Sequence, residues 1–166
     1  RADIKSFFES IPQHELVGKL LDDGFVSRRT VRYLKRVLYA YNYKAEIKDE
    51  KGLPRGLSFS SHLSELYMRS IDEKIRCLDG VYFYKRYVDD ILIVADPVKD
   101  SKESYWDTID GLFKEKQLNL HNDSEKKYIA CFDKQTTDAQ FDYLGYRFVY
   151  KNGKLDIWLS YKRYSK

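Results

Sequence analysis

Apolar residues recur three or four positions apart in four stretches of the chain, a spacing typical of helices that bury one face. In the longest stretch the repeat runs from Leu63 through Ile71 to Ile75. Pro12 stands where the first turn of a helix tolerates proline, and Gly24 stands where a helix can end. The pattern predicts helices over residues 11–24, 27–41, 58–78 and 101–116.

Other stretches alternate between apolar and polar residues, which is the period of a strand. Residues 91–95 instead form a short apolar run, as in a more buried strand. Asn152 and Gly153 suit the two-residue type I′ turn of a hairpin. Strands are predicted over residues 1–4, 81–88, 91–95, 127–132, 141–150 and 154–160. This order of elements predicts an α+β fold in which an antiparallel sheet packs on helices.

Length and composition are those of a globular protein, with 166 residues, 43% of them hydrophobic and 16% aromatic. We expect a core domain over residues 1–135 and a small hairpin subdomain over residues 136–166. No apolar run is long enough to span a membrane, so a cytoplasmic protein is expected. Cys77 and Cys131 lack metal-ligand spacing and are interpreted as reduced core thiols. Because the chain begins at Arg1 rather than methionine, we interpret it as a piece of a longer protein.

The net charge of +4 is compatible with a nucleic-acid partner but does not require one. A group of cations falls off the apolar stripe of the predicted helix over residues 27–41. They are Arg28, Arg29, Arg32, Lys35 and Arg36. At this stage a solvated helix face explains them better than a nucleic-acid contact.

Two adjacent acids, Asp89 and Asp90, lie between the predicted strands 81–88 and 91–95, in an otherwise apolar and aromatic run. Like charges in a partly buried place repel each other and lose hydration, so a positive group should compensate them. Asp3 adds a third acid in the first predicted strand. A divalent metal is the strongest candidate for the compensating charge, and two such ions could activate a 3′ hydroxyl and stabilise a leaving pyrophosphate.

The three histidines, His14, His62 and His121, share no ligand spacing and are interpreted as structural or surface residues.

Five ordered blocks of sequence surround these acids: ADIKSFF, GLPRGLSFSS, YVDD, LNLHNDSEKK and FDYLGY. In this order they resemble the palm domain of reverse transcriptases over nearly the whole chain. The resemblance implies a polymerase palm, with an antiparallel sheet over helices and a C-terminal β-hairpin that resembles the family's primer grip. It also implies two Mg²⁺ ions, for which Mn²⁺ could substitute. Asp3 and Asp89 would be metal ligands, Asp90 would lie in or next to the same shell, and the carbonyl of Ile4 would help to hold one ion.

The resemblance also implies residues that contact the incoming nucleotide. Phe8 would be a steric gate against the ribose 2′-hydroxyl. Strand alternation would put Phe7 and Phe8 on opposite faces, so one of the two is expected to be plain core. The loop that contains Pro54, Arg55 and Gly56 would face the nucleotide and template, but the family usually has glutamine where this chain has Arg55. Arginine cannot accept hydrogen bonds, so it could contact the triphosphate or the template backbone instead.

Lys126 resembles the family lysine that protonates the leaving pyrophosphate; Lys127 is an alternative, and a solvated surface lysine is another. The primer would contact Tyr87, Leu144 and Gly145, although an amphipathic hairpin with a glycine bulge explains the last two equally well.

As a function, the resemblance implies RNA-directed DNA synthesis from an RNA template, with dNTPs and a DNA or protein primer. The subtype looks closest to bacterial antiphage defence enzymes of the abortive-infection type, with retron and group II intron enzymes next. Untemplated, protein-primed synthesis, a catalytically inactive palm used as an RNA-binding scaffold, and a nucleotide cyclase are the alternatives. The full-length protein could form a homo-oligomer. Residues 1–166 alone, without fingers and thumb, are expected not to polymerise.

Overall fold

The computed structural model describes residues 1–96, 102–130 and 138–161, without the side chains of 102–104. Helices in these ranges are α1 (Phe7–Ser10), α2 (Gln13–Asp23), α3 (Arg28–Lys44), α4 (Ser58–Arg76) and α5 (Lys102–Glu115). Strands are β1 (Ala2–Asp3), β2 (Val81–Tyr87), β3 (Asp90–Ala95), β4 (Asp138–Tyr143), β5 (Tyr146–Lys151) and β6 (Lys154–Leu159). The mixture of helices and antiparallel sheets confirms the α+β prediction. No helix within these ranges is long and apolar enough to cross a membrane.

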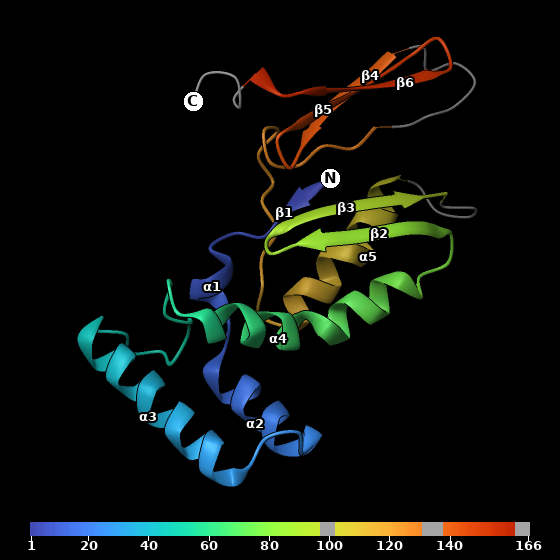
Figure 1. The fold of residues 1–166 in the computed structure, drawn as a ribbon. Coiled ribbons are helices and arrows are strands. Elements are labelled where there is room, and N and C mark those ends of the chain that lie inside the picture. The colour runs from blue at the N-terminus through green and yellow to red at the C-terminus, as the bar shows by residue number, and fades with distance from the viewer. Residues whose placement is uncertain (97–101, 131–137, 162–166) are drawn as a thin grey trace.

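The first sheet has the strand order β1-β3-β2, and all its neighbouring strands are antiparallel. Helix α4 packs on β2 and contacts α5, and the two helices lie beneath the sheet in Figure 1. Between these layers lies an apolar core in which Ile71, Ile75, Ile91 and Phe113 are almost completely buried. The core fixes the ends of β1 and β3 relative to each other, which is where the acids stand.

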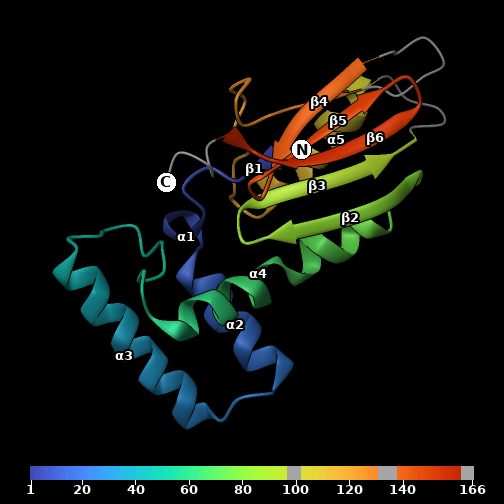
Figure 2. The same cartoon turned by 45° about the horizontal axis from the view of Figure 1, so that its top comes forward.

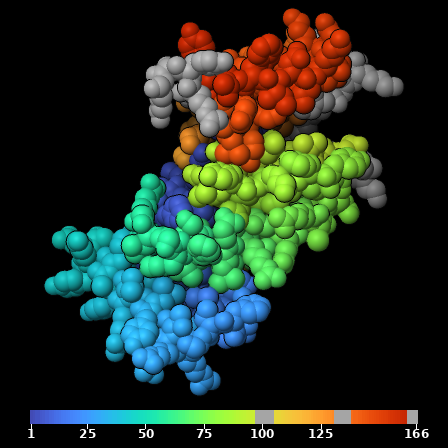
Figure 3. Space-filling model, in the orientation of Figure 1, coloured from blue at the N-terminus to red at the C-terminus, as the bar shows by residue number. Residues whose placement is uncertain are grey.

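Helices α2 and α3 pair with each other and extend away from the first sheet, as Figures 1 and 3 show. The backbone at Gly24 ends α2 in the left-handed conformation that glycine adopts without strain. Ser27 caps α3, because its side chain accepts a hydrogen bond from the amide of Thr30. Helix α3 continues to Lys44, one turn beyond the predicted end.

The second sheet is a three-stranded meander of β4, β5 and β6, seen above β1 in Figure 2. The prediction of one strand over residues 141–150 was wrong, because Leu144 and Gly145 both adopt positive φ and form a tight turn. The predicted turn at Asn152 and Gly153 is confirmed, with φ angles of 49° and 77°. Positive φ at both central residues is the signature of a type I′ turn, which suits the twist of the paired strands.

Three further predictions from the sequence need correction. The strand does not continue to Phe7, because Ser6 adopts a left-handed φ of 47° and helix α1 begins after it. Residues 127–130 form no strand; Tyr128 instead exchanges two backbone hydrogen bonds with Arg1. Cys77 is exposed at the end of α4 rather than buried, while Cys131 lies outside the described residues.

We expect the substitution Gly80→Ala to destabilise the protein by about 2 kcal/mol or more. Gly80 connects α4 to β2 with φ of 82°, and a Cβ there would lie 2.2 Å from the backbone oxygen of Asp96. That oxygen belongs to backbone and cannot move aside as a side chain could. Urea denaturation followed by circular dichroism measures the change. Gly18→Ala is the matched control, since a Cβ at Gly18 meets nothing within 4 Å. This substitution should stabilise α2, because alanine has less conformational freedom than glycine in the unfolded chain. Equal changes in the free energy of unfolding for both variants would contradict the predicted clash at Gly80.

Candidate active site

The hairpin of β2 and β3 places the acid pair at one end of the first sheet. Its turn contains Val88 and Asp89, and Val88 adopts a left-handed φ of 56°. Strand β1 lies beside β3, so that Asp3 stands opposite Asp90. The amide of Ile4 donates a 3.0 Å hydrogen bond to the carbonyl of Asp89, which ties the turn to β1. Three acids that are up to 87 residues apart in sequence therefore meet at one edge of the fold.

A shallow pocket of about 320 Å³ opens beside these acids. It is lined by residues from β1, α1, the loop before α4, the β2–β3 turn and the segment after α5: Asp3, Ile4, Ser6, Phe7, Phe8, Arg55, Val88, Asp89, His121 and Lys126. Six residues predicted from the sequence as site residues thus share one cavity: Asp3, Ile4, Phe8, Arg55, Asp89 and Lys126.

Lys126 lies over the acids. Its ammonium group donates a 2.6 Å hydrogen bond to Oδ2 of Asp3, whose side chain is almost buried. This hydrogen bond raises the pKa of Lys126, and the charges of Asp3, Asp90 and Asp89 raise it further, so the lysine stays protonated at neutral pH. The alternative, Lys127, instead lies 4.0 Å over the ring of Trp106. The geometry brings Lys126, not its neighbour, to the pocket.

The environment of Asp90 reflects the crowding of negative charge. Burial raises the pKa of its carboxyl group, and the charges of Asp3 and Asp89 raise it further, while Arg1 lowers it. The Arg1 guanidinium lies 3.5 Å from Oδ1 of Asp90. The carboxylates of Asp3 and Asp89 therefore lie close enough to Asp90 to repel its negative charge. A cation bound between the three groups would reduce this repulsion.

His121 is a pocket residue that sequence reasoning missed. Its Nε2 lies 3.5 Å from Oδ1 of Asp3, and its backbone amide donates to the carbonyl of Asp3. The isolated bridge between Ile4 and Leu120 holds this segment beside β1. No ligand spacing could have indicated His121, because its place depends on a backbone pairing across more than one hundred residues.

The donor groups of the pocket are those that Mg²⁺ prefers, although they do not form a closed site. Among the described residues, no three histidine, cysteine, aspartate or glutamate side chains already converge as a closed metal site. Magnesium, however, takes only one or two protein carboxylates and completes its shell with water and phosphate oxygens. Asp3 and Asp89 offer such oxygens to one open pocket, and Lys126 already holds positive charge there. The donor set fits a hard divalent cation that arrives with phosphate groups.

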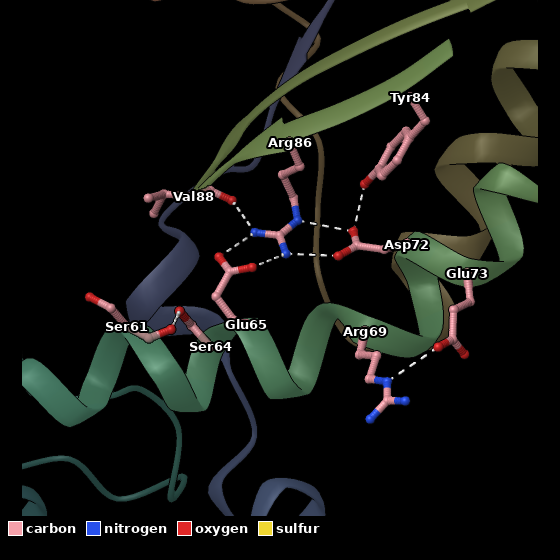
Figure 4. Close-up of polar contacts among 9 residues, drawn as sticks. All are labelled: Ser61, Ser64, Glu65, Arg69, Asp72, Glu73, Tyr84, Arg86 and Val88. Atoms are coloured by element: carbon pink, nitrogen blue, oxygen red, sulfur yellow. Dashed lines mark hydrogen bonds and ion pairs between the residues drawn. The ribbon is translucent and has the colours of Figure 1, made fainter. Parts of the chain in front are cut away.

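A buried arginine, also missed from the sequence, fixes the turn that carries Asp89. Figure 4 shows Arg86 of β2 between the turn and helix α4. Its Nη1 donates a 2.9 Å hydrogen bond to the carbonyl of Val88, and its other nitrogens bind Asp72 and Glu65 of α4. Although burial alone would lower it, hydrogen bonds to Asp72 and Glu65 raise the pKa of Arg86.

The carboxylate of Asp72 is the buried centre of this network. It accepts hydrogen bonds from Arg86 and a 2.6 Å hydrogen bond from the hydroxyl of Tyr84. Burial raises the pKa of Tyr84, and the charge of Asp72 raises it further, so its hydroxyl remains a donor. The network thus connects the long helix to the strand that ends at the acids.

The loop before α4 brings Arg55 to the pocket but leaves its neighbours outside. Arg55 donates a 2.6 Å hydrogen bond to the carboxylate of Glu9, which lowers the pKa of Glu9. Pro54 is buried, and its carbonyl accepts from the hydroxyl of Ser60 at the start of α4. Gly56 is exposed with φ of 82° and does not line the pocket. Of this loop, the arginine is the residue positioned for a ligand.

Helix α1 presents the two phenylalanines differently from the predicted strand. Both line the pocket, but Phe7 is buried in the core and Phe8 is only half-buried. The carbonyl of Phe8 accepts a 2.8 Å hydrogen bond from the amide of Leu53, which joins α1 to the loop before α4. Phe8 is therefore the ring that can meet a ligand, and Phe7 is core.

The residues predicted to contact a primer do not line the pocket. Tyr87 is exposed at the end of β2, directly opposite Asp90. Leu144 and Gly145 form the turn between β4 and β5. The neighbouring Tyr143 is buried, and its pKa is raised by burial and by the charge of Asp90, so this turn lies near the acids.

An antiparallel sheet on helices, with carboxylates and a lysine at one end, is the arrangement of a palm-type nucleotidyltransferase. Residues 1–148 match the family model described as Reverse transcriptase (RNA-dependent DNA polymerase). The chain therefore belongs to the reverse transcriptase family, whose members are RNA-directed DNA polymerases. A search of the curated proteins finds no match.

Proposed function

We propose that this protein adds deoxynucleotides to a primer 3′ hydroxyl under the direction of an RNA template. The observation that carries the proposal is the pocket in which Asp3 and Asp89 face Lys126 beside the half-buried ring of Phe8. Two divalent ions, when bound, would activate the attacking hydroxyl and stabilise the leaving pyrophosphate. Asp3 and Asp89 would hold them, together with the carbonyl of Ile4, and Mn²⁺ could replace Mg²⁺.

The remaining acids and the lysine take complementary roles in this proposal. Asp90 adds negative charge beside the ligands, and its contact with Arg1 limits the repulsion among the three acids. Lys126, whose pKa is raised by its hydrogen bond to Asp3, would give its proton to the pyrophosphate as that group leaves. The hydrogen bond between Lys126 and Asp3 would weaken once these residues held an ion or a triphosphate.

Nucleic acid would approach from the two sides of the pocket. Pro54, Arg55 and Gly56 would face the nucleotide and template, with Arg55 free to leave Glu9 for a phosphate. Tyr87, Leu144 and Gly145 would contact the primer, because the β4–β5 turn lies near Asp90. In the proposed division into a core over residues 1–135 and a hairpin subdomain over residues 136–166, Tyr87 belongs to the core, and Leu144 and Gly145 belong to the hairpin subdomain.

Arg55 also favours a second candidate, untemplated synthesis primed by protein. The charged Arg55 stands where the resemblance led us to expect glutamine, and it is paired with Glu9 rather than aimed at a base. We place the biological role in bacterial antiphage defence, in the cytoplasm, on the resemblance of the C-terminal sequence. A dedicated noncoding RNA as template and a homo-oligomeric full-length protein belong to the same proposal.

The deciding experiment measures incorporation of labelled dNTPs and NTPs with Mg²⁺, with and without an RNA template and primer. Template-dependent incorporation of dNTPs supports the proposal. Incorporation that ignores the template supports the second candidate and makes Arg55→Gln the next variant to assay. Absence of incorporation under every priming condition, with RNA binding retained, contradicts both and leaves a scaffold role.

We expect Phe8→Val to admit ribonucleotides, because a smaller side chain leaves room for the 2′-hydroxyl. The preference for dNTP over NTP, taken as the ratio of kcat/KM values, should fall by about 10- to 100-fold. Phe25→Val is the matched control, since Phe25 is 81% exposed and lies away from the pocket. An unchanged preference in Phe8→Val would remove the steric gate from the proposal.

A further inference from the structure

Helix α3 carries an uneven share of the positive charge. It contains six lysines and arginines and no acid, whereas the net charge of the whole chain is +4, so all other residues together carry −2. Its cations are Arg28, Arg29, Arg32, Lys35, Arg36 and Lys44. Among the described residues, none of these six forms an ion pair with a carboxylate.

The other helices with described surface cations differ from α3, because α2, α4 and α5 each contain at least one cation paired with a carboxylate. Lys19, Arg69, Lys74 and Lys114 each lie within 3.5 Å of a carboxylate. Three of these four pairs join residues four positions apart on one helix, a spacing that stabilises helices. Among the described residues, α3 is therefore distinguished from α2, α4 and α5 by its lack of such pairs.

The cations of α3 also work against the helix that carries them. Arg28 and Arg29 occupy its first turn, where the helix dipole favours negative charge. Arg32 and Arg36 are four residues apart, a spacing at which like charges destabilise a helix. Helix stability consequently does not explain why all charged residues of α3 are positive. A solvated helix face would be more stable with the mixed charges found on α2, α4 and α5.

Three tyrosines share the outer side of α3 with three of the arginines. Val31 and Leu38 are buried, and on the opposite side of the helix exposed arginines alternate with exposed tyrosines. We call this surface the α3 stripe: Arg29, Arg32, Arg36, Tyr33, Tyr39 and Tyr43. Tyr39 and Tyr43 are 73% and 81% exposed, and the guanidinium of Arg29 lies 5.7 Å from the centre of the Tyr33 ring.

The far end of the stripe leads back to the pocket. Asn42, near the C-terminal end of α3, exchanges hydrogen bonds with Gln13, which also donates to the carbonyl of Gly52 in the loop before α4. Helix α3 runs outward to the edge of the molecule (Figures 1 and 3). Its 17 residues correspond to a length of about 25 Å.

From this placement we infer that the α3 stripe binds single-stranded RNA on its way to or from the pocket. Unpaired arginines neutralise phosphates, and exposed tyrosines offer flat faces on which unpaired bases stack. Duplex nucleic acid would use the arginines but not the tyrosines, because its bases are already stacked. The inference deepens the proposed function and rests on it for the identity of the strand as template, but binding itself does not require catalysis.

The test measures the affinity of the protein for short fluorescein-labelled oligouridine by fluorescence anisotropy at several salt concentrations. Arg29→Gln, Arg32→Gln and Arg36→Gln, combined, should raise Kd at least about tenfold and reduce the slope of log K against log salt by about two. The charge-matched control combines Arg69→Gln, Lys74→Gln and Lys114→Gln and should change Kd by no more than about twofold. Equal losses of affinity in both triple variants would mean that RNA binds through the overall positive charge of the protein, and would overturn the inference.

Tyr39→Ala and Tyr43→Ala, combined, test the stacking part. They should raise Kd for oligouridine about tenfold or more and leave the salt slope unchanged. Their affinity for an RNA duplex of the same charge should not change, and tighter binding of the duplex by the parent protein would overturn the single-strand assignment. Circular dichroism of each variant checks that α3 still folds.

Asp89→Asn separates this inference from the proposed function. That variant should bind oligouridine like the parent protein even if it incorporates no nucleotide. If the parent protein itself incorporates no nucleotide but both stripe variants lose RNA binding, the proposed function fails and the RNA site stands. If incorporation is normal and both stripe variants bind RNA like the parent, the site fails and the function stands.

Discussion

Asp89→Asn should lower the rate of nucleotide incorporation by about a thousandfold or more while the protein stays folded. Loss of a carboxylate that holds a divalent cation removes several kcal/mol of transition-state stabilisation, and each 1.4 kcal/mol corresponds to about tenfold in rate. The substitution keeps the shape of the side chain. The backbone carbonyl of Asp89 still accepts the hydrogen bond from Ile4, so the turn should keep its place. Incorporation of labelled dNTP on a primed RNA template measures the rate.

Thermal unfolding of the same variant distinguishes a chemical role from a structural one. Because Asp89 and Asp3 both raise the pKa of Asp90, removing one charge relieves repulsion, and Tm should stay the same or rise slightly. The matched control combines Asp22→Asn and Asp23→Asn, an adjacent acid pair at the end of α2 that lies outside the pocket. The control should retain incorporation. Full activity of Asp89→Asn, or equal loss in the control, would contradict the role of Asp89.

Arg86→Met should destabilise the protein by about 3–5 kcal/mol, the usual cost of removing one partner from a buried ion pair. The side chain of Arg86 is only 3% exposed. Methionine would leave the buried carboxylate of Asp72 without its cation and the carbonyl of Val88 without its donor. Urea denaturation gives the free energy of unfolding. Arg69→Met is the matched control, because Arg69 forms an exposed pair with Glu73 that should be worth less than about 1 kcal/mol.

A second variant keeps this prediction testable if Arg86→Met fails to fold. Adding Asp72→Leu removes the orphaned charge, and the double variant should recover a large part of the lost stability. Its incorporation rate should nevertheless stay below that of the parent, because Val88 still lacks the donor that fixes the turn before Asp89. A double variant with normal stability and normal rate would show that Arg86 neutralises Asp72 and does nothing for the turn.

The local pattern of the sequence was sufficient for the four longer helices, for the β2–β3 hairpin and for the acid pair. Period 3.6 in residues 58–78 and period 2 in residues 81–88 predicted α4 and β2, since burial of one face leaves a direct trace in the order of residues. Two acids between two apolar strands predicted the hairpin turn at Asp89. Positive φ at Asn152 and Gly153 followed from residue type alone.

Local pattern was insufficient where a residue's environment depends on distant partners or on an unusual backbone angle. Ser6 and Leu144 adopt positive φ although neither residue type favours it. Leu144 divides the single strand predicted over residues 141–150, and Ser6 precedes a helix where strand alternation was expected for Phe7 and Phe8. Exposure of Cys77 likewise depends on what packs around the end of α4 and not on cysteine's usual preference for burial.

What the sequence by itself determined was therefore the four longer helices, the β2–β3 hairpin, the turn at Asn152, and the acids that resemblance and charge repulsion single out. Tertiary structure decided which groups surround those acids. Lys126 reaches Asp3 across 123 residues, and Arg86 ties the turn at Val88 to Asp72 of α4. Such contacts leave no periodic trace in the chain, because they arise only when the sheet and the long helix pack together and bring remote charges into a shared, poorly hydrated space.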